Sequence, residues 1–185
     1  DTVLVYTGTY YENLTIDSKS IYLKTKKIRD EGEFNIDGGQ NGRVITLSNT
    51  ANTVISGFTI QNADSDGDGG GIGVWNSKLK IINSIIKDNT ATHCGGIFIH
   101  TSDVEIIGCE IKNNNSQYNG GGIYIDVESL VTINSSNIIN NQAVYDGVLP
   151  DIDLGIYGGG GLFISNNTET IIINSIIWNN LPESI

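Results

Sequence analysis

The feature that most constrains this chain is an internal repeat of short apolar segments. The tripeptide GGI or GGL recurs at Gly70, Gly95, Gly121 and Gly160, with separations of 25, 26 and 39 residues. Isoleucines further along each unit form two columns in one register. The first holds Ile55, Ile81, Ile106, Ile133 and Ile172, and the second holds Ile60, Ile86, Ile111, Ile138 and Ile177. Two columns that keep the same register are hard to obtain by chance, and they indicate a repeat protein.

The repeat unit reads as three short strands. A period near 26 residues is too short for a propeller blade, and the segments lack helical periodicity. In one unit the alternating residues that we expect to point inward are Ile97, Ile99, Val104, Ile106, Cys109 and Ile111. The pattern predicts an all-β parallel solenoid with three parallel sheets, in which equivalent side chains of successive coils stack about 4.8 Å apart.

Small and polar residues also recur in register. Asparagines follow the third strand of each unit, and we predict that they adopt a left-handed backbone and form a hydrogen-bonded ladder. They are Asn89, Asn114, Asn141 and Asn180. A second column faces inward and contains Ser84, Cys109, Ser136 and Ser175, so Cys109 is interpreted as a packing residue. Cys94 replaces a turn glycine of the other units, and a bridge between Cys94 and Cys109 stays open.

These motifs resemble a known fold family. "GGIFI" together with "IKDN", "IKNN" and "IWNN" resembles the GGxI and [FI]xxN repeats of right-handed parallel β-helix proteins, including the polymorphic outer-membrane proteins of chlamydiae and secreted bacterial repeat proteins. The opening "DTVLVYTGTYYENLTIDSKSIYLKT" is similar to the first coil of pectin-lyase-like proteins. The resemblance implies a right-handed parallel β-helix over residues 1–185, with first coils over 1–50 and regular coils over 51–185. Its implication for activity is weak, because the fold carries many enzymes and also non-catalytic surface proteins.

Composition limits the classes of partner and indicates whether the chain is part of a longer protein. The formal net charge is -11, which argues against nucleic acid or an anionic membrane surface as partner. No apolar run approaches the roughly 20 residues of a membrane span, so we expect no membrane insertion of this chain. The chain contains no methionine, and its last segment resembles an interior coil. We therefore expect a piece of a longer protein, or a C-terminal end that another subunit covers.

An aromatic stripe is the first candidate site. Residues between the inward ones of the first strand must face outward, which places Phe98, Tyr124 and Phe163 in one column. Trp75 lies beside this stripe, as do His100 and Asp126, which form a candidate acid/base pair. Exposed aromatic rings are a common binding surface for sugar rings. The alternative is that the rings only stabilise the sheet by packing across strands.

An acidic segment is the second candidate site. "DSDGDGGG" places Asp64, Asp66 and Asp68 on alternate positions before glycines, as in the first half of a calcium loop. The bidentate glutamate expected at the twelfth position is missing, since Trp75 stands there. We therefore predict either a calcium site or a solvated acidic turn. A later turn with 13 extra residues brings Asp146, Asp151 and Asp153 to the same edge.

These candidates favour binding over catalysis. A polysaccharide lyase needs a basic residue beside its substrate, and this register places none of the ten Lys and Arg residues on the aromatic sheet. A glycoside hydrolase needs two carboxyl groups, and only Asp126 with Asp151 or Asp153 could supply them. We expect a non-catalytic module of a secreted or cell-surface protein, which binds a polysaccharide or a cell-surface protein in adhesion. The alternatives are a polysaccharide-acting enzyme of the pectin-lyase-like class and a structural subunit of an extracellular filament.

Overall fold

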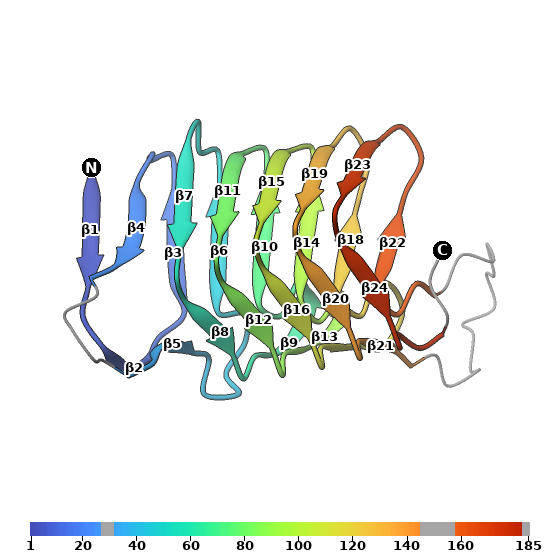
Figure 1. Cartoon of the computed structure of the whole chain (residues 1–185), viewed down its shortest axis with the longest axis horizontal. Coiled ribbons are helices and arrows are strands. Elements are labelled where there is room, and N and C mark those ends of the chain that lie inside the picture. The colour runs from blue at the N-terminus through green and yellow to red at the C-terminus, as the bar shows by residue number, and fades with distance from the viewer. Residues whose placement is uncertain (27–31, 145–157, 183–185) are drawn as a thin grey trace.

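The computed structural model describes residues 1–26, 32–144 and 158–182, and these residues form a parallel β-solenoid that contains no helix (Figure 1). Each coil contributes one strand to each of several parallel sheets. Sheet A consists of β1 (Thr2–Val5), β4 (Tyr22–Thr25), β7 (Thr53–Ser56), β11 (Lys78–Ile82), β15 (Asp103–Ile107), β19 (Leu130–Asn134) and β23 (Glu169–Ile173). Sheet B consists of β2 (Gly8–Tyr11), β5 (Phe34–Asp37), β8 (Thr59–Gln61), β12 (Ile85–Lys87), β16 (Glu110–Lys112), β20 (Asn137–Ile139) and β24 (Ile176–Trp178).

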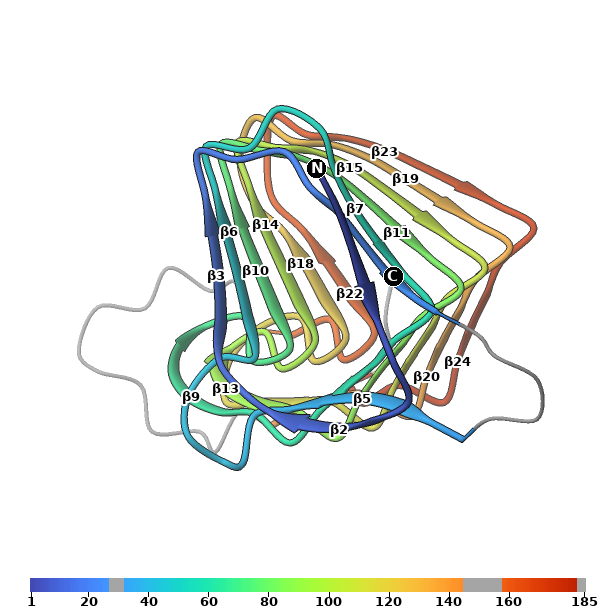
Figure 2. The same cartoon turned by 90° about the vertical axis from the view of Figure 1, so that its left-hand side faces the viewer.

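Two further sheets are shorter, with six strands in sheet C and four in sheet D. Sheet C consists of β3 (Leu14–Asp17), β6 (Ile45–Ser48), β10 (Ile72–Trp75), β14 (Ile97–His100), β18 (Ile123–Ile125) and β22 (Leu162–Ile164). Sheet D consists of β9 (Asp64–Asp68), β13 (Thr90–His93), β17 (Asn115–Ser116) and β21 (Gln142–Ala143). Figure 2 looks along the solenoid from its N-terminal end, where the sheets form the walls around the core. The predicted fold class is confirmed, but sheet D adds a fourth, short sheet where the sequence predicted only a turn.

The core consists of the two predicted isoleucine columns and their neighbours on sheet C. In sheet A, Ile55, Ile81, Ile106, Ile133 and Ile172 are paired in register from coil to coil. Sheet B pairs Ile60, Ile86, Ile111, Ile138 and Ile177 in the same way. In both columns the first four isoleucines are fully buried. The predicted inward register is therefore confirmed, since a slip of one residue would have turned these side chains outward.

The asparagine ladder is confirmed, but its predicted backbone conformation is wrong. At the corner after sheet B, the residue with positive φ is the one before the ladder asparagine, as at Asp88 (54°) and Asn113 (54°). This residue turns the chain from sheet B toward sheet D, and the next side chain then points into the interior. The ladder asparagine therefore keeps an ordinary backbone conformation.

The ladder satisfies polar groups that the turn buries. The Asn114 side-chain amide donates to Oδ1 of Asn141 at 2.9 Å and to the carbonyl oxygen of Ile86 at 3.0 Å. Its own Oδ1 accepts from the side-chain and backbone nitrogens of Asn89, at 3.0 and 3.2 Å. Asn114 is 1% exposed. Since buried polar groups are costly without partners, this repeated bonding stabilises the stack of turns.

Both cysteines are free and buried. Cys109 lies in the small-residue column, where its backbone N–H donates to Oγ of Ser136 at 3.0 Å. Its role as a packing residue agrees with this position. Cys94 has φ of 62° and occupies the corner that Gly69, Gly120 and Gly159 occupy in other coils. Burial raises the pKa of both thiols, so neither is an activated nucleophile.

Candidate functional site

The outer face of sheet C carries one aromatic ring in each of four coils. The ring centroids of Trp75 and Phe98 lie 5.5 Å apart, those of Phe98 and Tyr124 5.2 Å, and those of Tyr124 and Phe163 4.9 Å. Parallel pairing places Phe98, Tyr124 and Phe163 opposite one another on β14, β18 and β22. The predicted stripe is therefore continuous. Its rings pack edge to face, with interplanar angles of 90° and 80°, which is a favourable arrangement for aromatic pairs.

Phe98 differs from the prediction of an exposed ring. It is only 5% exposed, because Trp75 and Tyr124 pack on either side of it. Trp75, Tyr124 and Phe163 stay half-buried. The packing role considered as the alternative therefore holds for Phe98, while the other three rings remain accessible to a ligand.

The absence of a Cβ atom at Gly73 explains the orientation of the Trp75 ring. Gly73 is the β10 member of the column that continues as Phe98 and Tyr124. A Cβ atom there would collide with the six-membered ring of Trp75 and would lie 2.7 Å from Nε of Arg43. The indole thus folds back over the glycine instead of standing away from the sheet.

Arg43 completes this arrangement and corrects the prediction that no basic residue lies on the aromatic sheet. Its guanidinium carbon lies 4.5 Å from the centre of the Trp75 ring, and its Nη1 donates to Oγ1 of Thr46 on β6 at 3.2 Å. Nε and Nη2 donate to backbone carbonyls of Asp68 and Gly69. Four lysines do lie away from sheet C, as that prediction requires: Lys78 and Lys80 are on sheet A, and Lys87 and Lys112 are on sheet B. Sequence reasoning missed Arg43 because it precedes β6 and reaches the sheet with a long side chain.

His100 and Asp126 form the contact that the register predicts. Nδ1 of His100 lies 2.7 Å from Oδ2 of Asp126, which is a hydrogen-bonding distance. The side chains are 39% and 21% exposed. The ring of His100 also stacks on that of Phe98, with centroids 6.4 Å apart and planes 7° from parallel. The imidazole is held in one orientation at the edge of the aromatic stripe, where it can hydrogen-bond a ligand.

Tyr124 adds a polar group to the stripe. Its hydroxyl accepts a long hydrogen bond, 3.4 Å, from Oγ of Ser165. Burial raises the pKa of this hydroxyl, and the nearby Asp126 carboxylate raises it further. Tyr124 is therefore a neutral phenol near pH 7, which can both donate and accept hydrogen bonds.

The three aspartates of the calcium prediction lie on a strand instead of a loop. Asp64, Asp66 and Asp68 belong to β9, which pairs with β13 of the next coil. Alternate residues of an extended strand are about 7 Å apart, so their carboxylates do not converge on one point. Among the described residues, no three His, Cys, Asp or Glu side chains form a group that could hold a metal ion. This arrangement does not support the calcium loop, and calcium binding stays a prediction.

A polar groove runs over sheet D beside these aspartates. Its volume is about 360 Å³, and its lining includes Asp64, Asp66, Thr90, Asn115 and Gln117. Oδ1 of Asn115 is buried and has no hydrogen-bond partner among the described residues. Asp146, Asp151 and Asp153, which were predicted at the same edge, lie outside the described residues, so the predicted carboxyl pairs with Asp126 are not part of the described site.

Comparison with known proteins agrees with this architecture. Residues 33–185 match the family model described as the right-handed beta helix region. No curated protein and no solved structure matches the chain significantly. None of the described residues forms a helix long and apolar enough to cross a membrane. Because the family match covers most of the sequence, and the structure shows stacked parallel coils, the chain belongs to the family of right-handed parallel β-helix proteins.

Proposed function

We propose that this protein is a non-catalytic β-helix module, extracellular or at the cell surface, that binds a neutral glycan along the outer face of sheet C. The observation that carries the proposal is the continuous aromatic stripe, with rings 4.9 to 5.5 Å apart in successive coils. Successive coils are about 4.8 Å apart, a spacing comparable with one sugar unit of an extended polysaccharide. A linear glycan lying along the solenoid could thus meet one coil with each sugar.

The chemistry of this face suits sugar rings. Trp75, Tyr124 and Phe163 offer half-buried apolar surface for the C–H face of a sugar. His100, Asp126 and the Tyr124 hydroxyl offer hydrogen-bonding groups for sugar hydroxyls beside it. Phe98 packs between Trp75 and Tyr124, and Arg43 contacts the Trp75 ring.

Charge favours a neutral glycan over an acidic one at this site. Asp126 lies beside the stripe, and Asp64 and Asp66 are exposed on the adjoining sheet D. The charge of Arg43 is offset by the nearby Asp68 carboxylate, and its N–H groups donate to backbone carbonyls. A carboxylated or sulfated sugar would therefore meet uncompensated negative charge.

The test is titration of the protein with neutral oligosaccharides derived from cellulose, xylan, mannan and chitin, followed by calorimetry. We expect at least one series to bind, and Trp75→Ala to weaken its binding about tenfold or more, because a central aromatic contact carries much of the binding energy. Trp178→Ala is the matched control, since Trp178 is 71% exposed on β24 of sheet B. Absence of binding by every series, or equal losses in the two variants, would refute the proposal.

A polysaccharide-acting enzyme is the second candidate, and the His100–Asp126 contact of 2.7 Å favours it. A carboxylate that orients an imidazole is a common general base arrangement. The non-catalytic proposal predicts that prolonged incubation with the bound polysaccharide releases no new reducing ends or unsaturated products. Product formation that disappears in His100→Gln while glycan binding persists would establish the enzyme instead.

A further inference from the structure

A second surface with different chemistry lies on the outer face of sheet A at the N-terminal end. Strands β1 and β4 pair in parallel, with Thr2 opposite Tyr22 and Leu4 opposite Lys24. The pairing continues beyond the strands, because the backbone N–H of Lys26 donates to the carbonyl oxygen of Val5 at 2.7 Å. Alternation then puts Tyr6 and Lys26 on the same face as Tyr22 and Lys24. We refer to Tyr6, Tyr22, Lys24 and Lys26 as the tyrosine–lysine face.

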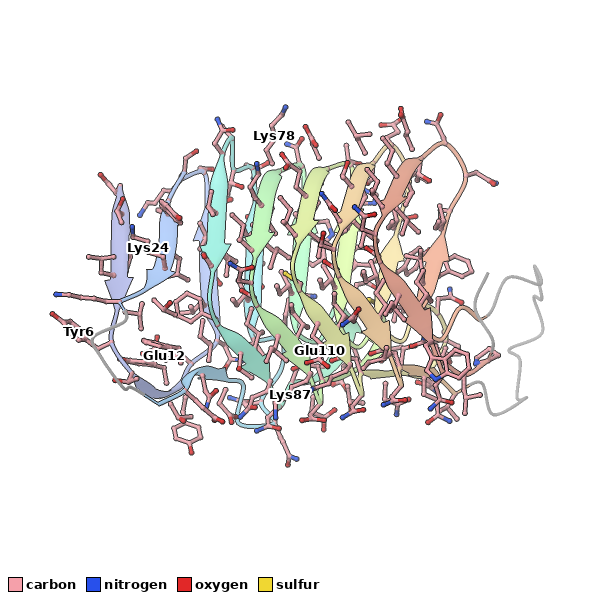
Figure 3. All side chains as sticks on the ribbon, viewed as in Figure 1. Tyr6, Glu12, Lys24, Lys78, Lys87 and Glu110 are labelled. Carbon is pink, nitrogen blue, oxygen red and sulfur yellow. The ribbon has the colours of Figure 1, made fainter. Side chains whose placement is uncertain are left out.

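The two lysines of this face contact aromatic rings. Nζ of Lys24 lies 4.9 Å from the centre of the Tyr22 ring, and Nζ of Lys26 lies 4.8 Å from that of Tyr6. Lys26 also donates a hydrogen bond of 3.0 Å to the Tyr6 hydroxyl. Tyr6 is 52% exposed and Tyr22 is 38% exposed. The rings therefore hold the ammonium groups in place without neutralising their charge. Figure 3 shows Tyr6 and Lys24 at the N-terminal end of the solenoid.

Four lysines of the middle coils are paired with carboxylates. Lys78 pairs with Asp103 at 2.9 Å, Lys80 with Glu105 at 2.9 Å, Lys87 with Asp88 at 3.3 Å, and Lys112 with Glu110 at 2.9 Å. Neither Lys24 nor Lys26 forms an ion pair with a carboxylate of the described residues. The tyrosine–lysine face thus carries positive charge that its described surroundings leave uncompensated.

This local charge stands in a chain whose net charge is -11. Screening in physiological salt limits the influence of the acidic remainder to about 8 Å. An anionic group that approaches the tyrosine–lysine face therefore meets local attraction.

We propose that the tyrosine–lysine face binds an acidic polysaccharide, with its carboxylate or sulfate groups at Lys24 and Lys26 and its sugar rings against Tyr6 and Tyr22. Such a polysaccharide carries widely spaced negative charges that are separated by the apolar faces of sugar rings. This arrangement is complementary to two lysines that lie among tyrosine rings. Nucleic acid or an anionic lipid surface carries denser charge over a larger area, and the acidic remainder of the protein would repel it. The face is separate from sheet C and takes the opposite class of glycan, so neither proposal depends on the other.

The experiment measures binding of immobilised protein to alginate, as a carboxylated chain, and to κ-carrageenan, as a sparsely sulfated chain, with neutral dextran beside them. We expect at least one acidic polymer to bind, neutral dextran not to bind, and affinity to fall as salt rises. The double variant Lys24→Ala/Lys26→Ala should weaken binding about tenfold, whereas Lys24→Arg/Lys26→Arg should retain most of it. Which of the two acidic polymers binds identifies the anionic group.

A matched control removes the same charge from another part of sheet A. Lys78→Ala/Lys80→Ala changes the net charge equally but acts on lysines that already have carboxylate partners. We expect it to change affinity less than twofold. Equal weakening by both double variants, unchanged binding by Lys24→Ala/Lys26→Ala, or binding to neither acidic polymer would overturn the proposal. So would tighter binding to phosphatidylserine vesicles or to a DNA oligonucleotide, each of which would assign the face to that partner.

Discussion

Buried polar side chains with several partners stabilise the turns of this solenoid. Asp37, at the end of β5, is 5% exposed and accepts three hydrogen bonds. The donors are the backbone N–H of Gly39 at 2.9 Å and the side-chain amides of Gln61 at 3.0 Å and Asn62 at 2.6 Å. Burial by itself raises the pKa of this carboxyl, but the hydrogen bonds outweigh it and hold the pKa below its ordinary value of 3.8.

Asp37→Asn should destabilise the protein at neutral pH by about 1–3 kcal/mol, because an amide cannot accept from all three donors. With its pKa lowered in the folded state, the carboxylate contributes stability above pH 3.8, and this contribution is lost as the pH falls below that value. Urea unfolding at pH 7, 5 and 3 should show the difference between the two proteins shrinking at the lowest pH.

The exposed Asp66→Asn serves as control and should change the free energy of unfolding by less than about 0.5 kcal/mol at each pH. A constant difference between wild type and Asp37→Asn from pH 7 to pH 3 would contradict the ionised role of Asp37.

At the scale of elements, the side chains that a strand can carry depend on the space that neighbouring strands leave. On sheet C, the β10 strand has glycine where the next coils have aromatic rings, and Trp75 and Arg43 fill that space. On sheet B, the alternation places Ile111 in the core and Lys112 outside within the same three-residue strand β16.

Gly73→Ala should displace the Trp75 ring while the solenoid stays folded, at a cost of about 1–3 kcal/mol for overpacking. In a Trp178→Phe background, where Trp75 alone reports, its fluorescence should shift to longer wavelength as the indole becomes more exposed. Gly67→Ala is the matched control, because a Cβ there meets only ordinary contacts of 3.7 and 3.8 Å. An unchanged spectrum in Gly73→Ala would mean that the indole does not lie over the glycine.

Ile111→Asp should unfold the protein, because it places an unpaired charge at a fully buried position in the middle of an isoleucine column. Circular dichroism should show loss of the β spectrum, or a melting temperature lowered by well over 10 °C. Lys112→Ser, on the outward side of the same strand, should keep the native spectrum. A native spectrum and melting temperature for Ile111→Asp would show that the inward register is wrong.

At the scale of the whole molecule, charge is unevenly distributed over the solenoid. The 21 acidic residues exceed the 10 basic ones, and the two proposed glycan surfaces differ in sign. Four cross-strand or neighbouring ion pairs lie at the surface of the middle coils, and surface pairs contribute little to stability. Net repulsion among carboxylates should therefore dominate the electrostatics of the fold.

Raising the ionic strength from about 0.01 M to 0.15 M shortens the screening length from about 30 to 8 Å and weakens this repulsion. We expect the melting temperature at pH 7 to rise by about 2–4 °C, equivalent to about 1 kcal/mol for a chain of this size. The effect should disappear near pH 4.3, the isoelectric point calculated from the sequence. A melting temperature that falls with salt at pH 7 would show that ion pairs outweigh the repulsion.

The sequence by itself determined the coil, its period and its inward face. Strand side chains alternate with a period of two and stack on their equivalents in the next coil. The isoleucine columns and the asparagine ladder can therefore be recognised from the sequence alone. The same rule predicted the aromatic column and the contact between His100 and Asp126, since both follow from register alone.

Only the tertiary structure decided how side chains share space between coils. The burial of Phe98, the folded-back ring of Trp75 and the position of Arg43 depend on the room above Gly73, which belongs to no local pattern. Likewise, Asp64–Asp68 forms a strand because β13 of the next coil pairs with it, although its composition favours a turn. Periodicity specifies which face a residue occupies. The conformation of a long side chain, and whether a segment of low β-propensity forms a strand, depend on residues of the neighbouring coils.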